Sequence, residues 1–303
     1  MSAPNARRRL NDQTAVGLLL AGPAMLGLFL FILAPFLVAL ALAFTNLRLG
    51  SPLPLEFVGV KQFERIFTDP DFLRALSNNL LFASTVVPLQ TALALGLALL
   101  LNRGLRGTVV FRTLFFMPVV FPMSLVAVVW VLIYAPGPEG MMNGFLDLVT
   151  LGAWEPRDFL RDPMLAMPAL MLLSIWQGAG FQMVILLAGL QQIPEELYEA
   201  AALDGAGRWS QFRHVTLPQL RNSLVFVVLV TSILAFRLFD QVQIMTRGGP
   251  DGATTTVIYE AVQAVFTRQQ VARASAMTVV FFLLVLALTW LQRRLARQER
   301  EIG

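Results

Sequence analysis

The stretch that decides the fold runs from residue 164 to residue 190 and reads MLAMPALMLLSIWQGAGFQMVILLAGL. It contains no charged residue, although polar residues such as Ser174 and Gln177 interrupt the apolar run. A helix needs about 20 predominantly apolar residues to cross the hydrocarbon core of a bilayer. The stretch therefore predicts a transmembrane helix whose polar residues find partners inside a bundle, because lipid offers none.

Five further stretches of the same kind lie on either side of it. They cover residues 16–44, 79–101, 113–134, 220–243 and 274–291. The first is long for the apolar region of a signal peptide and no small-residue cleavage site follows it, so we expect it to be retained. The sequence predicts an all-α membrane protein with six transmembrane helices. Its parts are a tail (1–15), the first helix (16–44), an external loop (45–78), a five-helix core (79–292) and a second tail (293–303).

Composition supports the membrane class and excludes several chemistries. Hydrophobic residues make up 56% of the 303 residues, charged residues only 14%, and the mean hydropathy is +0.67. A soluble domain carries about 25% charged residues. There is no cysteine and one histidine, His214, so we expect no metal site and no catalytic residue. The lone lysine, Lys61, is not part of a Gly-Lys-Ser/Thr sequence, so the chain has no P-loop for ATP.

The positions of the arginines predict the orientation. Positive charge collects in alternate connections, at residues 1–15, 102–112, 191–221 and 292–303, whereas the other connections carry a small acidic excess. Basic connections stay on the cytoplasmic side of a membrane. We therefore expect a multi-pass protein of the cytoplasmic membrane with both termini in the cytoplasm. Its surroundings are lipid, and nothing calls for a nucleic-acid partner.

The two connections at residues 47–77 and 135–163 are on the predicted outer face. Each is long, polar and rich in proline and glycine. They serve either as linkers or as a surface that docks an external partner, and the length of the two favours docking.

The inner connection at residues 193–218 has the sequence pattern of two short helices. Pro194, Glu195 and Glu196 are typical of a helix start, and Gly205 of a helix end. A second helix is predicted from about residue 208 to 214, ended by Pro218. The first helix is nearly free of side-chain bulk at residues 200–202, so another surface could approach it closely. The connection is either an elbow on the membrane surface or a knob that fits a cytoplasmic partner.

This connection resembles the EAA motif of ABC-importer permeases. Glu199-Ala200-Ala201 is followed after three residues by Gly205, and after nine more by Val215-Thr216-Leu217-Pro218, where the family has Ile-x-Leu-Pro. The wider chain is similar to the first-permease branch of the carbohydrate-uptake subfamily, including the maltose and glycerol-3-phosphate permeases. That similarity is carried by residues 57–60, 112–118, 239–241, 248–250 and 254–256.

The resemblance implies partners and roles. It implies a second permease subunit, two ATPase subunits that bind ATP and Mg, and an external solute-binding protein, with no cofactor in this chain. The coupling to the ATPase falls on the EAA connection, at Glu199, Ala200, Ala201, Asp204, Gly205 and Pro218. The solute would be a mono- or oligosaccharide or a related polyol. Glycerol 3-phosphate or a glycerophosphodiester is the alternative, and a gradient-driven carrier is a third class.

The fourth predicted helix offers a path for the solute. Ser174, Gln177, Gly178 and Phe181 are spaced three to four residues apart and so share one helix face. Small and amide residues also serve helix packing, so both roles are open for each residue. The family's use of this stretch favours transport for the whole group.

The fifth predicted helix adds Thr231 and Arg237 to the expected path. A guanidinium at the bilayer centre costs about 2.5–3.5 kcal/mol on insertion scales, so an intramembrane arginine indicates a site. Asp240 lies three residues further on, where a helix would bring the two charges together. A structural ion pair is favoured over a solute contact, and an anionic solute would strengthen the case for the solute contact.

Overall fold

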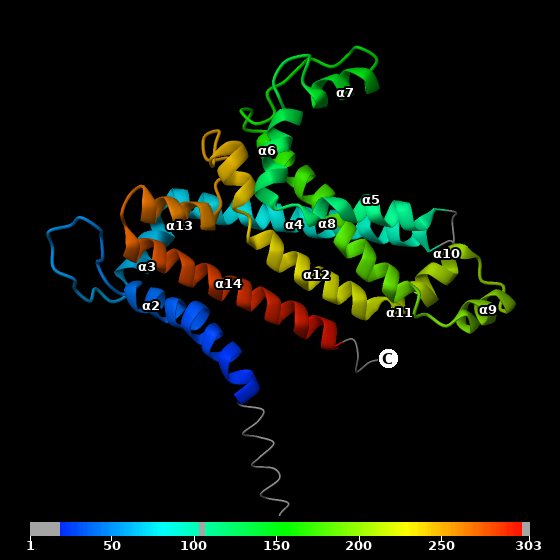
Figure 1. Ribbon diagram of the computed structural model, residues 1–303, viewed down its shortest axis with the longest axis horizontal. Helices are drawn as coiled ribbons and strands as arrows, with labels where there is room; N and C mark the ends of the chain where they lie inside the picture. The colour runs from blue at the N-terminus through cyan, green and yellow to red at the C-terminus, as the bar shows by residue number, and fades with distance from the viewer. Residues whose placement is uncertain (1–18, 103–106, 299–303) are drawn as a thin grey trace, which may run out of the picture.

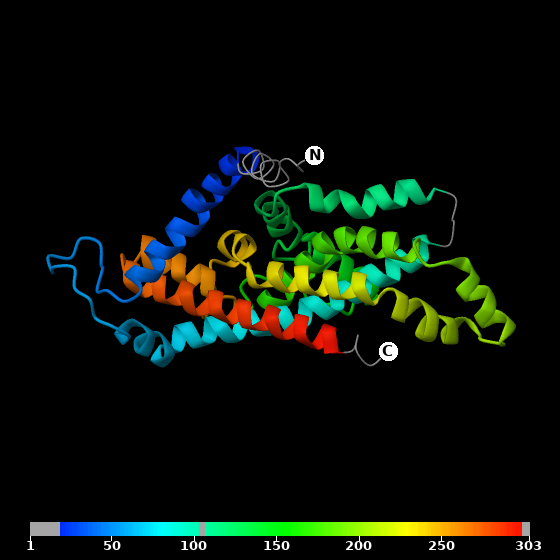
Figure 2. The same ribbon diagram turned by 90° about the horizontal axis from the view of Figure 1, so that it is seen from below.

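The computed structural model describes residues 19–102 and 107–298, and these are helical apart from the connecting segments. Within these two ranges the only β-type pairing is an isolated bridge between Thr45 and Phe57. Long helices run along the long axis of the molecule, with α9 and α10 at one end and α3 at the other (Figures 1 and 2). The predicted all-α class is confirmed. The predicted tail 1–15 and residues 299–303 lie outside the described residues.

Four helices are long and apolar enough to cross a membrane unbroken. They are Leu19–Leu42, which includes η1 (Phe29–Leu33) and α2 (Ala34–Leu42), then α4 (Pro70–Leu101), α8 (Ala166–Leu190) and α14 (Val271–Gln298). Two bent pairs also pass if each counts as one span: α5 (Thr108–Val120) with α6 (Met123–Ile133), and Arg208–Gln219 with α12 (Arg221–Phe236). The described residues therefore offer four to six spans, and the predicted six is the upper limit.

The second predicted helix is longer than its apolar stretch. The helix α4 begins at Pro70, whereas hydropathy placed its start at residue 79. The Asp69 side chain accepts a hydrogen bond from the backbone N–H of Asp71, and Pro70 occupies the first helical position. Both features initiate helices regardless of hydropathy. The predicted external loop therefore ends nine residues early, because its last part is the polar first part of α4.

The third predicted helix is not continuous. α5 and α6 meet at an angle of 100° across Phe121 and Pro122. Pro122 has the extended backbone of an N-cap residue (φ −55°, ψ 138°), and the residue before a proline is itself pushed out of the helical region. Phe121 accordingly has φ −82° and ψ 139°. The predicted single helix over residues 113–134 is wrong, and Pro122 is the cause.

The connections that are predicted to lie outside contain short helices of their own: α3 (Lys61–Thr68), α7 (Met141–Val149) and α13 (Val257–Phe266). The connection that holds α7 is organised by Asn143, whose side chain is 1% exposed. Its Oδ1 accepts hydrogen bonds from Trp154 Nε1 and the Arg157 N–H, and its Nδ2 donates to the Arg157 carbonyl, each at 3.0 Å. This segment is therefore a folded part of the protein.

The last helix also exceeds its prediction. α14 continues to Gln298, so the first part of the predicted tail 293–303 is helical. Among the long helices, α4 packs against α8 and α12, α5 packs against α8, and α12 and α2 pack against α14. This packing brings the polar residues of α4, α8 and α12 to the same place inside the bundle.

Candidate functional site

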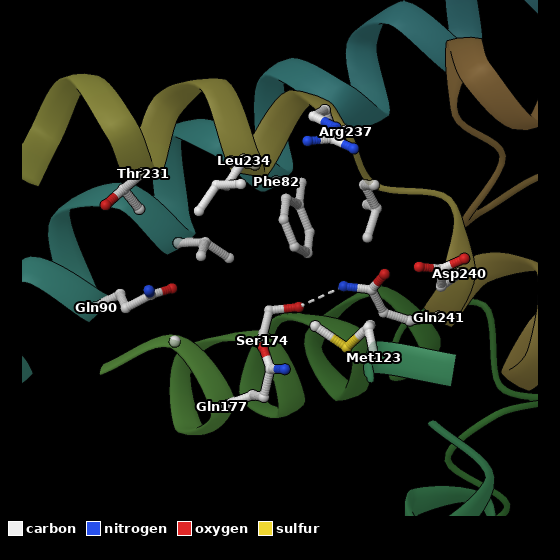
Figure 3. A pocket seen from close by; sticks show the side chains of 14 residues that line it. Phe82, Gln90, Met123, Ser174, Gln177, Thr231, Leu234, Arg237, Asp240 and Gln241 are labelled. Atoms are coloured by element: carbon white, nitrogen blue, oxygen red, sulfur yellow. Dashed lines mark hydrogen bonds between the residues drawn. The ribbon is translucent and has the colours of Figure 1, made fainter. Parts of the chain in front are cut away.

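A cavity of about 290 Å³ lies between α4, α8 and the end of α12, and we call it the central cavity (Figure 3). Amide, hydroxyl and charged side chains share its wall with apolar ones. The lining residues are Phe82, Val86, Gln90, Met123, Ser174, Gln177, Gly178, Thr231, Leu234, Ala235, Arg237, Leu238, Asp240 and Gln241.

Hydrogen bonds fix the polar wall in place. Gln241 Nε2 donates to Ser174 Oγ at 3.0 Å, and the Ser174 hydroxyl donates to the Leu170 carbonyl at 2.9 Å (Figure 3). Gln177 Nε2 donates to the Phe121 carbonyl at 3.4 Å, at the bend between α5 and α6. The break in the third span therefore supplies a backbone acceptor to a residue of the cavity.

Five of the six predicted path residues line the central cavity: Ser174, Gln177, Gly178, Thr231 and Arg237. Phe181 does not, although it shares the predicted face of α8. It lies about one turn further along α8 and its side chain is 37% exposed. Sequence reasoning missed Gln90 and Gln241. Gln90 is the single amide between Leu80 and Leu101 of α4, which is the signal that could have found it.

Gly178 and Gly180, two of the three glycines of α8, have separate roles. The position of a Cβ at Gly178 is occupied by the flexible amide end of Gln90, which lines the cavity. A Cβ at Gly180 would overlap the backbone oxygen of Phe115 on α5. Gly178 therefore belongs to the cavity wall, and Gly180 to the contact between α8 and α5.

Arg237 and Asp240 form no ion pair. The helical spacing that predicted the pair does not exist, because α12 ends at Phe236 and Arg237 has a non-helical backbone (φ −82°, ψ 19°). Both side chains are exposed, and both line the central cavity without contacting each other (Figure 3). The predicted structural ion pair is wrong, and the guanidinium and the carboxylate are both available to the cavity.

The EAA connection forms a separate segment at the far end of the molecule, which we call the coupling segment (residues 193–220) (Figure 1). It consists of α9 (Glu195–Leu203), α10 (Arg208–Gln211), η2 (Phe212–Thr216) and α11 (Leu217–Gln219). Of the predicted residues, Ala201 is half-buried and the rest are exposed: Glu199, Ala200, Asp204, Gly205 and Pro218.

Gly205 ends α9 as predicted. Its φ is +78°, in the left-handed region that favours glycine. The Ala206 N–H donates to the Ala201 carbonyl at 2.9 Å, and the Gly205 N–H donates to the Ala202 carbonyl at 3.0 Å. These two bonds are those of a Schellman cap. The turn after α9 is thus fixed by one glycine.

Pro218 does not end the second short helix as predicted. α10 continues through the π-helical turn η2 into α11, and the chain bends by 67° only at Leu220. The N–H of Leu217 bonds to the Phe212 carbonyl, five residues back, so the wider turn accommodates a proline that an α-helix would exclude. Tyr198 Oη lies 3.0 Å from Thr216 Oγ1, which ties α9 to this turn.

Comparisons with known proteins agree with this arrangement. The family model of the binding-protein-dependent transport system inner membrane component matches residues 90–301. The diacetylchitobiose uptake system permease protein of Streptomyces coelicolor is 34% identical over 305 residues, covering 96% of this chain and 86% of that protein. The sulfoquinovosyl glycerol transport system permease protein of Agrobacterium fabrum is 34% identical over 290 residues, covering 95% of this chain and 92% of that protein.

A solved structure shares the fold. The crystal structure of a bacterial ABC transporter involved in the import of the acidic polysaccharide alginate aligns with a TM-score of 0.81 at 21% identity. The alignment covers 96% of this chain and 99% of the other chain. The family match spans more than half of the sequence, and the described helices have the same arrangement. This chain therefore belongs to the family of inner membrane components of binding-protein-dependent transport systems.

Proposed function

We propose that this chain is the permease subunit of an ATP-driven importer that moves a sugar or a related polyol into the cell. The observation that carries the proposal is the wall of the central cavity, where the amides of Gln90, Gln177 and Gln241 meet the hydroxyls of Ser174 and Thr231. Amides and hydroxyls donate and accept hydrogen bonds, as sugar hydroxyls do. A few convergent polar groups in a largely apolar pocket are typical of a small-molecule site.

The relatives support this solute class. Besides the diacetylchitobiose and sulfoquinovosyl glycerol permeases, the trehalose/maltose transport system permease protein of Thermococcus litoralis is 33% identical over 245 residues. The solutes in these names carry several hydroxyl groups on a ring or a short chain. A cavity of about 290 Å³ has room for one such ring or short chain at a time.

The chain works in an assembly. A second permease subunit completes the path, two ATPase subunits bind ATP and Mg, and an external binding protein delivers the solute. A solved alginate transporter is in complex with an alginate pentasaccharide-bound periplasmic protein, which supports the last partner. The coupling segment and both termini face the cytoplasm, in line with the basic residues of those connections.

The coupling segment transmits the state of the ATPase. The exposed Glu199 and Asp204 offer charges to a partner, whereas Ala200 and Ala201 permit close approach to the backbone of α9. Leu203 and Trp209 are 90% and 72% exposed beside them. Exposed apolar side chains next to charged ones are typical of a protein contact. Gly205 and Pro218 shape the two turns that present this surface.

Glycerol 3-phosphate is the second candidate solute. Arg237 in the cavity wall, which has no ion-pair partner within residues 19–102 and 107–298, favours it, because guanidinium binds phosphate well. The sn-glycerol-3-phosphate transport system permease protein of Yersinia enterocolitica is 33% identical over 246 residues, or 80% of this chain. A gradient-driven carrier is disfavoured, because Asp240 is the one carboxylate among the residues that line the described cavity.

Uptake by the reconstituted importer tests the proposal. The complex that co-purifies with this chain is placed in liposomes with its binding protein, and labelled diacetylchitobiose, trehalose, maltose and glycerol 3-phosphate are offered in turn. We expect uptake of at least one sugar that requires both internal ATP and the binding protein. Uptake of glycerol 3-phosphate alone would favour the second candidate, and uptake that persists without ATP would contradict an ATP-driven importer.

A pair of glycine variants tests the coupling role. Gly205→Ala forces a side chain into a left-handed backbone, at a cost of about 1–2 kcal/mol, although there is open space around it. Gly207→Ala is the matched control, since Gly207 has φ −73° and equally open surroundings. We expect Gly205→Ala to insert normally but to reduce solute-stimulated ATP hydrolysis severalfold, and Gly207→Ala to match the wild type. Equal stimulation in both variants would refute the role of Gly205.

A further inference from the structure

A second cavity lies beside the outer connections, and no residue of it belongs to the central cavity. Its volume is about 330 Å³, and we call it the outer pocket. It is lined by Val131, Tyr134, Pro136, Asp158, Leu160, Arg161, Ile244, Met245, Thr246 and Arg247. These residues come from the end of α6, the connection that follows it, and the π-helical turn η3 (Val242–Thr246).

The backbone at the outer pocket is irregular. The turn η3 is a π-helix, a form frequently found at functional sites. Arg247, which ends the turn, has φ +53°, a left-handed conformation that is strained for any residue other than glycine. Its N–H donates to the Val242 carbonyl at 2.6 Å, and its carbonyl accepts from Tyr259 Oη at 2.7 Å. The fold thus holds an arginine in a costly conformation at the edge of a cavity.

The charged groups of the pocket are available to a ligand. Within residues 19–102 and 107–298 the exposed Arg247 guanidinium makes no hydrogen bond or ion pair. Arg161 and Asp158 are 3.8 Å apart at the nearest nitrogen and oxygen, an open surface pair of little energetic value. Asp158 Oδ1 also accepts a hydrogen bond from the Arg161 N–H at 3.2 Å, which leaves Oδ2 as the freer acceptor. The Tyr134 hydroxyl is already used, since it donates to the Ala169 carbonyl at 3.1 Å. Ligand recognition therefore falls on two guanidiniums and one carboxylate.

This set of groups suits a hydroxylated ring. Guanidiniums donate hydrogen bonds in a fixed fork and a carboxylate accepts them, so together they can bind neighbouring hydroxyl oxygens and hydrogens. Apolar side chains such as Leu160, Ile244 and Pro136 form the rest of the wall and can cover the C–H face of a ring. A volume near 300 Å³ is at the small end of ligand pockets, enough for a single ring.

The outer pocket and the central cavity are joined by two neighbouring helices. α6 packs against η3. At one end of this pair Met123 and Gln241 line the central cavity, and at the other end Tyr134 and Arg247 line the outer pocket. Irregular backbone within a membrane protein is tolerated where it borders a water-filled space. The break after Phe236 and the π-turn η3 both lie on this stretch.

We propose that the outer pocket is a second solute-binding subsite, which takes a sugar ring on its way from the binding protein to the central cavity. The inference rests on the proposed function, because it assigns a further binding position to the same solute. Arg247 is its specificity-determining residue, with Arg161 and Asp158 as the neighbouring contacts.

Single cysteines can test the subsite directly, because the chain has no cysteine of its own. Ile244→Cys reports on the outer pocket, Leu234→Cys on the central cavity, and Leu151→Cys, at a position that is 93% exposed and lines neither, is the control. Each assembled importer is treated with a membrane-impermeant thiol reagent in the presence of binding protein that is either empty or loaded with maltose, trehalose or diacetylchitobiose.

The expected result is that a transported sugar slows labelling at Ile244→Cys and Leu234→Cys severalfold and leaves Leu151→Cys unchanged. Protection at Leu234→Cys without protection at Ile244→Cys would overturn the outer subsite and leave the proposed function standing. Protection at neither position, together with no uptake of any sugar, would overturn both.

Transport kinetics give an independent readout. Arg247→Gln removes a charged donor, a loss that corresponds to about tenfold or more in affinity. We expect the sugar concentration for half-maximal uptake to rise about tenfold in Arg247→Gln, with partial recovery in Arg247→Lys. Arg157→Gln is the matched control, an exposed arginine in the connection after α6 that does not line the pocket. Identical uptake curves for Arg247→Gln and Arg157→Gln would refute the assignment.

Discussion

α8 and α12 both carry polar side chains to the central cavity, but α8 is one helix from Ala166 to Leu190 whereas α12 ends at Phe236. In α8 the Ser174 hydroxyl bonds to the helix's own backbone. Beyond α12 the Leu238 carbonyl is bonded at 2.8 Å by the Thr256 hydroxyl from a different part of the chain. The backbone of α8 is helical throughout, whereas the backbone carbonyl of Leu238, beyond the end of α12, depends on a distant residue for its hydrogen bond.

The largest expected effect concerns the unbroken helix. Gly180→Ala places a Cβ against the backbone oxygen of Phe115, which cannot move without shifting α5. Overpacking of this kind costs about 3 kcal/mol when the obstacle is rigid. We expect the midpoint of thermal unfolding in detergent to fall strongly and little assembled importer to form.

Gly96→Ala is the control for that variant. Gly96 lies within the helix α4 with nothing near the position of a Cβ, and alanine favours a helix over glycine by about 1 kcal/mol. Its unfolding midpoint should stay level or rise. If Gly180→Ala were as stable as Gly96→Ala, the close contact between α8 and α5 would not be a requirement of the fold.

The next effect concerns the hydrogen bond from Thr256 to the Leu238 carbonyl, just beyond the end of α12. Thr256→Val keeps the shape of a fully buried side chain but removes the hydroxyl that bonds Leu238 and caps α13. A buried carbonyl without a partner and a lost cap together cost about 2 kcal/mol. We expect a lower unfolding midpoint and reduced uptake. The control Thr267→Val removes an exposed hydroxyl at the other end of α13 and should change neither.

The sequence predicted the unbroken spans well and the broken ones poorly, for physical reasons. Residues 164–190 are predominantly apolar and contain no charged residue, and the helix α8 follows them within two residues. The bend at Pro122 carries a local signal that the hydropathy profile ignores. The break at residues 237–239 carries none, because Arg237-Leu238-Phe239 contains neither proline nor glycine. It depends on Thr256, which only the folded chain brings near.

The residues of the candidate site were likewise predictable where they lie on an unbroken helix and unpredictable where they follow a break. Ser174, Gln177 and Gly178 were predictable because helical spacing puts them on one face of an unbroken helix. Gln241 was not, because its place beside Ser174 follows from the break after α12. The pairing of Arg237 with Asp240 failed for the same reason, since it assumed a continuous helix.

A smaller effect tests the bond that joins the two helices at the cavity. Ser174→Ala leaves the amide nitrogen of Gln241, a side chain only 7% exposed, without its acceptor. An unpaired buried donor costs about 1 kcal/mol, softened here by water in the cavity. We expect a modest fall in the unfolding midpoint and a change in uptake. Ser84→Ala is the matched control, because the Ser84 hydroxyl makes the same bond to its own helix at an exposed position. Equal behaviour of the two variants would show that the link to Gln241 contributes nothing.

The smallest expected effect distinguishes a broken helix from a continuous one most directly. In a continuous helix Arg237 and Asp240 would be partners, and removing either charge would expose the other to lipid or to the bundle. In the structure they face the cavity separately, so each can be neutralised at the same cost whether or not the other is present. A double-mutant cycle of Arg237→Gln and Asp240→Asn, read as the free energy of unfolding in a denaturing-detergent titration, should give a coupling free energy below about 0.5 kcal/mol.

Uptake should nevertheless respond to Arg237→Gln, most of all for an anionic solute such as glycerol 3-phosphate. A coupling of about 1 kcal/mol or more would restore the ion pair and place the end of α12 beyond Asp240.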